Sequence, residues 1–96
     1  MREQDFVDFL NNDPSISSSK AVATRMKHAR RAELLIGTDL DIVVNDDDAM
    51  YEALEKLKQS DSPSHAPMQN AVRKYYKFRN GKEFPKMKDY HSPKHP

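Results

Sequence analysis

The chain has no cysteine and only two glycines among its 96 residues. Without cysteine, neither a disulfide framework nor a thiolate metal site can form, so packing alone must hold the fold together. The absence is typical of proteins in the reducing cytoplasm, and we expect a cytoplasmic location. Both glycines, Gly37 and Gly81, follow segments with helical periodicity, which favours an all-α fold.

Long hydrophobic runs are also missing. The N-terminal stretch MREQDFVDFL lacks the apolar run that a secretory signal peptide needs, and no segment approaches the ~20 apolar residues of a membrane-spanning helix. We therefore expect a soluble protein without a membrane partner. Because a chain of 96 residues buries a limited core, a large enclosed active site is not expected either.

Hydrophobic periodicity predicts a small four-helix bundle in one domain, residues 3–84. Its helices are expected at about 3–11, from a serine cap near 17–19 to Gly37, at about 47–59, and from Pro67 to Asn80. The stretch TDLDIVV, residues 38–44, fits a strand or a helical turn. Since a lone strand would have no pairing partner, we expect a turn or short helix there. Residues 85–96, rich in proline and lysine, are expected to form a flexible (disordered) basic tail.

Charge is segregated along the chain although the net charge is only +1. Residues 1–17 sum to −3, residues 18–38 to +4, residues 39–61 to −6 and residues 62–96 to +6. Such blocks create local potentials that steer a charged partner even when the whole molecule is nearly neutral.

The second predicted helix carries a basic stripe opposite its apolar side. At about 100° per residue, one side gathers Val22, Met26 and Ala29. The opposite side gathers Lys20, Thr24, Lys27 and Arg31, with His28 at its edge. A charged solvent-facing side needs no function, but such a side usually mixes acids among the bases, and no acid interrupts residues 20–31.

The fourth predicted helix repeats this arrangement. Its polar side carries Asn70, Arg73, Lys74 and Lys77, away from the apolar stripe of Met68, Ala71, Val72, Tyr75 and Phe78. If the two basic sides adjoin, their six cations form a patch that can replace the counterions condensed on a nucleic-acid backbone. Tyr76, at the border of the stripe, is expected in the core rather than stacked on a base.

No catalytic or metal motif accompanies these surfaces. The acidic run 46–48 does not fit a calcium loop, because counting twelve residues from Asp39 reaches Met50 where a glutamate is required, and it fits a helix cap instead. His91 and His95 have helical spacing, but Pro93 between them disfavours the helix that would align them on zinc. We therefore expect no enzymatic activity, no metal and no cofactor.

Three segments together resemble the core-binding, SAM-like N-terminal domain of tyrosine recombinases and phage integrases. NAVRKYYKFRNGKEF, residues 70–84, resembles the final helix of that domain and its exit. SSSKAVATRMKHARRAELLIG, residues 17–37, resembles its serine-capped basic helix, and DLDIVVNDDDAMYEALEKL, residues 39–57, resembles its acidic turn and the following helix. The resemblance covers about residues 3–84 and implies a helical bundle that clamps one face of duplex DNA.

The resemblance assigns the phosphate contacts to matching positions. These are Lys20, Thr24, Lys27 and Arg31, with Arg73, Lys74 and Lys77; His28 and Asn70 lie beside them. A recombinase continues into a catalytic domain with an arginine and tyrosine active site, and Tyr90 in its proline-rich segment does not match that nucleophile. We therefore expect a non-catalytic DNA-binding module, whether it belongs to a longer recombinase-like protein or stands alone. The alternative is a protein-interaction module or small regulator whose basic face docks on an acidic protein partner.

Overall fold

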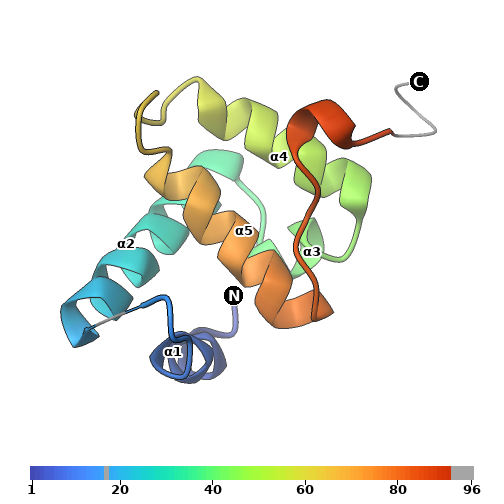
Figure 1. Ribbon diagram of the computed structural model, residues 1–96. Helices are drawn as coiled ribbons and strands as arrows, with labels where there is room; N and C mark the ends of the chain where they lie inside the picture. The colour runs from blue at the N-terminus through green and yellow to red at the C-terminus, as the bar shows by residue number, and fades with distance from the viewer. Residues whose placement is uncertain (17, 92–96) are drawn as a thin grey trace.

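The computed structural model describes residues 1–16 and 18–91, and this part of the chain contains helices but no strand (Figure 1). The elements are α1 Glu3–Asn11, α2 Ser19–Ile36, α3 Leu40–Val43, α4 Asp47–Lys58, α5 Pro67–Asn80 and the 3-10 helix η1 Met87–Asp89. The predicted all-α class is confirmed. The bundle has α3 as an additional single-turn helix, at the place where a turn or short helix was expected.

The ends of α2 follow from its flanking residues. The Ser18 hydroxyl accepts a hydrogen bond from the Ala21 amide at 3.1 Å, which satisfies one of the amides that a first helical turn leaves without a partner. At the other end, Gly37 has a φ of 79°, a left-handed conformation that glycine adopts without a steric penalty. These two residues fix the limits of the longest helix.

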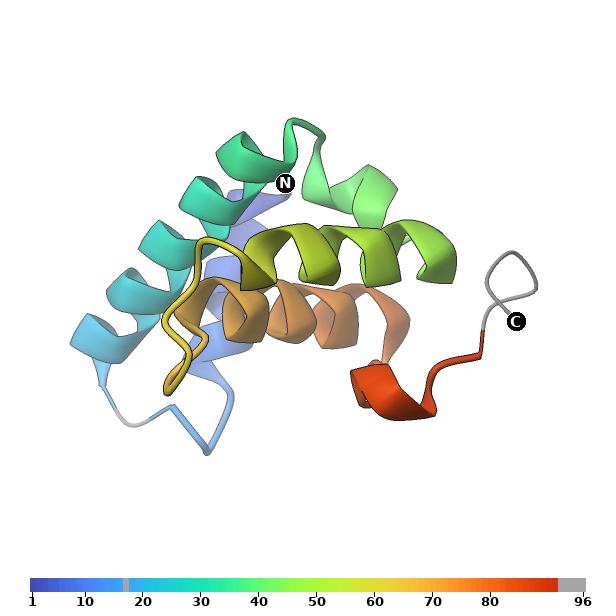
Figure 2. The same cartoon turned by 90° about the horizontal axis from the view of Figure 1, so that it is seen from above.

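Helix α5 is the centre of the bundle and contacts all four other α-helices (Figures 1 and 2). Its buried side chains are Met68, Ala71, Val72, Tyr75 and Tyr76, and Phe78 is partly buried. The Tyr75 hydroxyl donates to Asp41 and accepts from the Arg2 amide, and the Tyr76 hydroxyl donates to Asp47 at 2.8 Å. The expectation that Tyr76 lies in the core is confirmed. Because each buried phenol has a partner, both tyrosines can pack in the interior without an unsatisfied polar atom.

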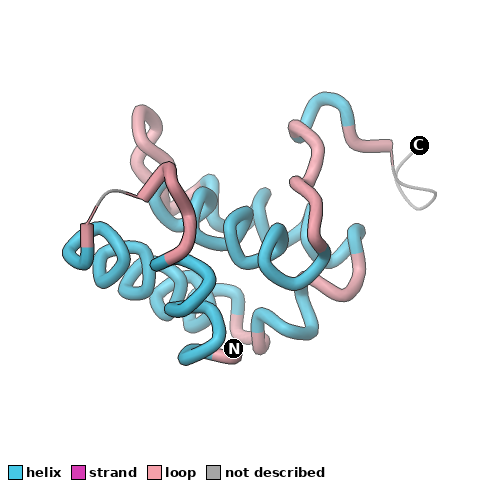
Figure 3. The backbone as a smooth tube through the Cα atoms, turned by 60° about the horizontal axis from the view of Figure 1, so that its bottom comes forward, coloured by secondary structure: helices cyan, strands magenta, loops and turns pink. Residues whose placement is uncertain are grey.

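The one-turn helix α3 contributes Leu40 and Val43 to the core. Asp39 caps it by accepting a hydrogen bond from the Asp41 amide at 2.9 Å. At α4 the same role falls to Asp46, whose carboxylate accepts from the Asp48 amide at 2.9 Å. The cap interpretation of the acidic run therefore holds for its first residue. Figure 3 shows these short connections, and the loop between α4 and α5 that projects from the bundle.

The chain after α5 packs back onto the bundle further than expected. Phe84 is buried, with its ring 5.2 Å from that of Tyr76. Tyr90 stacks on Tyr51 and donates a hydrogen bond to Asp48 at 2.5 Å. Residues 85–96 were expected to form a flexible tail, but residues 85–91 run across the bundle as a packed segment (Figure 1). The rest of the predicted tail, residues 92–96, lies outside the described residues.

None of the helices in the described ranges combines the length and the apolar character that a membrane crossing requires. The longest of them, α2, carries charged side chains along most of its length.

Candidate nucleic-acid interface

Helices α2 and α5 make the most extensive helix pair of the bundle, and a groove follows their junction. Two adjoining hollows form it. The first is lined by Ser18, Lys20, Ala21, Thr24, Arg25, His28, His65, Pro67 and Asn70, and the second by Arg25, Asn70, Arg73, Lys74, Lys77, Glu83, Phe84 and Lys86. Arg25 and Asn70 line both, so the two hollows are continuous. We call this feature the basic groove.

The predicted basic side of α5 and part of that of α2 meet along the basic groove. No residue of α3 or α4 lines it, so the acidic helices do not cover it. Among its lining residues Glu83 is the single carboxylate, against six lysines and arginines. A concave surface of one charge sign with low-dielectric walls concentrates the electrostatic field, which raises the local concentration of an anionic partner.

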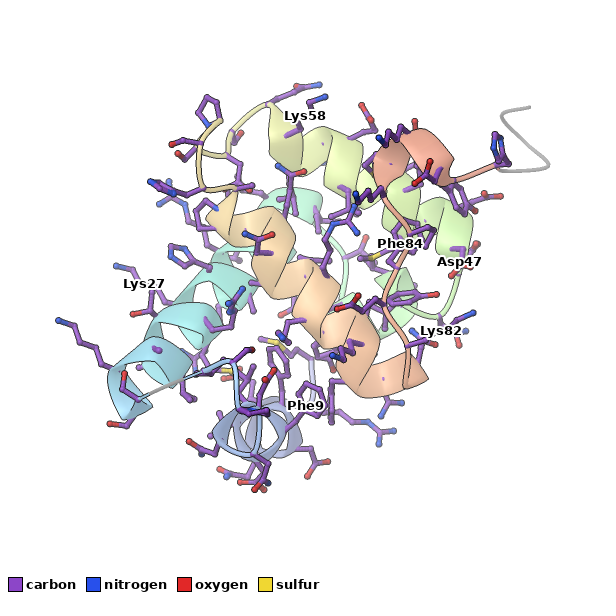
Figure 4. The ribbon with its side chains drawn as sticks, in the orientation of Figure 1. Phe9, Lys27, Asp47, Lys58, Lys82 and Phe84 are labelled. Carbon is purple, nitrogen blue, oxygen red and sulfur yellow. The ribbon has the colours of Figure 1, made fainter. Side chains whose placement is uncertain are left out.

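Only part of the predicted basic stripe of α2 lines the groove. Its apolar residues Val22, Met26 and Ala29 are buried, as expected. Lys20, Thr24 and His28 line the groove, whereas Lys27 and Arg31 do not. Figure 4 shows Lys27 directed away from α5. The prediction that all five residues form one contact surface is therefore too broad for a ligand that lies in the groove.

Arg73 of α5 is largely occupied by the protein itself. Its guanidinium donates hydrogen bonds to the backbone oxygens of Phe84 at 3.0 Å and Pro85 at 3.2 Å, and it lies over the Phe84 ring. Desolvation by burial lowers the pKa of Arg73, but the guanidinium of an arginine stays charged at neutral pH. Arg73 thus anchors the C-terminal segment and contributes its charge to the groove wall from a fixed position.

Lys74 is engaged even more strongly. Its ammonium lies 2.7 Å from the Asp13 carboxylate, with side-chain exposures of only 17% and 11%. The hydrogen bonds from Lys74 and Ser15 hold the pKa of Asp13 well below its ordinary value. We expected Lys74 to contact phosphates, but its charge is compensated by Asp13 because the loop after α1 returns to α5.

Two other predicted residues of α5 keep a role in the groove. The Lys77 ammonium is half-exposed and lies 3.9 Å from Glu83, a weak surface pair. The Asn70 side chain donates to the His65 backbone oxygen at 2.9 Å and is itself exposed. Both can therefore reach a ligand without breaking a buried interaction.

The structure adds two cations that sequence reasoning missed. Arg25 lies at the junction of the two hollows, and Lys86 reaches the groove from the C-terminal segment. Within residues 1–16 and 18–91, neither makes an ion pair or a side-chain hydrogen bond. At about 100° per residue, Arg25 lies ~40° around the helix from Ala29 and ~100° from Met26. It is therefore at the edge of the buried side, where the sequence does not say which neighbour it faces. Lys86 carries no sequence signal, because its position depends on the packing of Phe84.

The described residues contain no group of three or more histidine, aspartate or glutamate side chains placed to hold a metal ion. His91 is one of the described residues. His95, the other histidine of the zinc pair that Pro93 disfavours, lies outside them.

In comparisons with known proteins, no family model matches this chain, and no curated protein and no solved structure matches it. The resemblance to the recombinase core-binding domain thus remains a prediction from the sequence.

Proposed function

We propose that this protein is a non-catalytic module that binds duplex DNA through its phosphate backbone, with the basic groove as the contact surface. The observation that carries the proposal is the convergence of Lys20, Arg25, Lys77 and Lys86 on one continuous groove. These four come from α2, α5 and the C-terminal segment, so only the folded chain brings them together. Release of condensed counterions on phosphate binding supplies the driving force.

The lining of the groove supports phosphate contacts over base recognition. The aromatic ring nearest the groove, Phe84, is buried, and Tyr76 is buried behind it. Proteins that bind single strands rely on exposed aromatic rings on which bases stack. A row of cations without exposed aromatic rings fits the phosphates of a duplex better than the bases of a single strand. Thr24 and Asn70, both exposed, add neutral hydrogen-bonding groups to the same surface.

The size of the contact follows from helix geometry. With a rise of about 1.5 Å per residue, Lys20 to His28 spans ~12 Å of α2 and Asn70 to Lys77 spans ~10 Å of α5. Those lengths correspond to a few phosphates on one face of a duplex. Four engaged phosphates predict a plot of log K against log salt with a slope near −3.6.

A salt titration with matched variants tests the proposal. The groove variant carries Lys20→Glu and Lys86→Glu; the control carries Lys58→Glu and Lys82→Glu, two exposed lysines that do not line the groove (Figure 4). Both variants change the net charge equally. The groove variant should bind a mixed-sequence duplex at least ~10-fold more weakly, with a salt slope reduced by about 2. Equal losses in the two variants, or binding that ignores salt, would contradict the proposal.

A third variant separates the groove from the outer side of α2. Lys27→Glu with Arg31→Glu changes the net charge by the same amount, on two α2 residues that do not line the groove. We expect it to weaken binding less than the groove variant, through the general field alone. A loss as large as that of the groove variant would move the contact surface to the outer side of α2.

The same groove also suits an acidic polypeptide, and one observation favours keeping that second candidate. Ala21 and Pro67 give the first hollow an apolar floor between its basic walls. An acidic peptide with one or two apolar side chains would use this floor, whereas a duplex would not. Replacing Ala21 by aspartate should therefore weaken peptide binding strongly. It should weaken DNA binding no more than one added negative charge elsewhere in the groove does.

A further inference from the structure

The described chain exposes three large aliphatic side chains, and they lie within nine residues of one another. Leu34 is 82% exposed, Ile42 63% and Leu35 40%. The other large hydrophobic residues of the described part are buried or packed against the core. A single exposed leucine needs no explanation, but a cluster of them is typical of an interaction surface.

The three residues lie around the turn that joins α2 to α3. Leu34 borders a shallow hollow with Glu33, Gly37, Thr38 and Asp39, and Ile42 borders a second with Ile36, Thr38 and Ala49. Thr38 belongs to both hollows, so the patch is continuous. Figure 2 shows this turn at the edge of the bundle opposite η1. None of the three residues lines the basic groove, so the patch is a separate surface.

Charge is arranged with opposite signs on the two sides of the patch. Arg31 precedes Leu34 and Leu35 by one helical turn and is exposed, without an ion pair inside the described chain. At the other end of the patch, Asp39 lines the hollow next to Leu34, with Glu33 beside it. The Met1 ammonium lies 2.7 Å from Asp39 and 3.2 Å from Glu33, and compensates one of the two negative charges. A net negative charge remains in this hollow. The Ile42 hollow also has Glu52 and Lys56 in its lining, one charge of each sign, which leaves its balance neutral.

A surface with a cation on one side and anions on the other side of an apolar centre is complementary to itself. In a two-fold contact the same patch is used by both molecules, and each end meets the opposite end of the other copy. Packing two α2 helices antiparallel through Leu34 and Leu35 brings Arg31 of one copy opposite the Thr38–Asp39 turn of the other. This arrangement covers the leucines and gives the arginine a carboxylate.

We propose that the end of α2 and the helix α3 form a dimer interface for a second copy of this chain. The occupant follows from the charge pattern, since a partner with charge of one sign only would meet like charge at one end of the patch. Three aliphatic residues make a small contact compared with the ~800 Å² per partner of a standard interface, so the dimer is weak and forms at high protein concentration. This interface does not depend on the basic groove.

Disulfide trapping tests the interface directly, because the natural chain has no cysteine. Leu34→Cys introduces one thiol at the centre of the patch, and Ser60→Cys introduces one at an exposed control site after α4. Within a dimer the two thiols share a high effective concentration, so Leu34→Cys should cross-link roughly tenfold faster than Ser60→Cys. Equal cross-linking rates would overturn the proposal.

Sedimentation of the natural chain, without DNA, gives the second measurement. The average mass should rise toward that of a dimer with concentration, and Arg31→Glu or Leu34→Glu should keep the protein monomeric. Lys58→Glu, at an exposed position of α4 away from the patch, should leave the dimer unchanged. A natural chain that stays monomeric near 1 mM would refute self-association and indicate a different occupant of the patch. A failure here leaves the DNA titration unaffected, because that assay uses dilute protein.

Discussion

The ammonium of Lys74 and the carboxylate of Asp13 lie 2.7 Å apart although 61 residues separate them in the sequence. Asp13 sits in the loop between α1 and α2, and Lys74 is in the middle of α5. The pair therefore ties the beginning of the chain to its central helix, next to the groove that we assign to DNA.

Removing the amine of this pair should lower stability more than DNA affinity. Lys74→Met leaves the Asp13 carboxylate largely buried without its cation, which should cost about 1–3 kcal/mol of unfolding free energy. Lys20→Met, at an exposed position, should change stability by less than ~0.5 kcal/mol. Urea unfolding of both variants measures the difference. If Lys74→Met weakened DNA binding more than Lys20→Met without loss of stability, the structural role of Lys74 would be refuted.

The same pair predicts a loss of stability in acid. The pKa of Asp13 is lowered in the folded chain from an ordinary value of 3.8, so the folded state binds this proton less readily than the unfolded state. The stabilisation is complete above about pH 5 and declines as the pH falls through 3.8 toward the folded value. Asp13→Asn should be less stable at neutral pH and should lose less on acidification. Thermal unfolding between pH 2 and 7 tests this, and parallel curves for the two proteins would contradict it.

The tyrosines of the core predict the opposite behaviour in base. Burial and the hydrogen bond to Asp47 raise the pKa of Tyr76 from 10.0 to about 12. Its neutral form is favoured by folding, so the stabilisation is present below pH 10 and is lost as the pH rises toward 12. Tyr76→Phe should cost about 1 kcal/mol at neutral pH and show a smaller loss of stability in alkali. Urea unfolding at pH 7 and pH 11 measures both, and an unchanged alkaline loss would assign it to other groups.

Phe84 predicts a link between the core and the C-terminal segment. The ring is buried against Tyr76 and under Arg73, so Phe84→Ala should cost about 3 kcal/mol. Phe84→Leu keeps most of the apolar volume and should cost less than half as much. Denaturant titration compares the two. Equal and small losses would mean that residues 84–91 contribute little to the fold.

The sequence predicts the limits of the helices well because local chemistry decides them. A serine before α2, Gly37 after it, an aspartate before α4 and Pro67 at the start of α5 each act on the first or last turn of one helix. The helix ends observed lie within one residue of those expected for α1, α4 and α5. Even the choice of Ser18 among three serines depends only on which hydroxyl reaches an amide.

The composition of the groove could not be predicted in the same way. Helical periodicity places residues around a helix axis, but the rotation of α2 against α5 is set by packing of the whole core. That rotation turns Arg25 toward α5 and Lys27 away from it. Asp13 and Lys86 reach the groove region through loops whose paths depend on contacts tens of residues away. Long-range pairing of this kind leaves no periodic signal in one sequence.

The segment after α5 seals the hydrophobic interior with Phe84 and carries Lys86 to the groove two residues later. A ligand that holds Lys86 in place therefore also opposes the local opening that would expose the core between α4 and α5. By thermodynamic linkage, binding in the groove should slow amide hydrogen exchange in α4, a helix that contributes no residue to the groove.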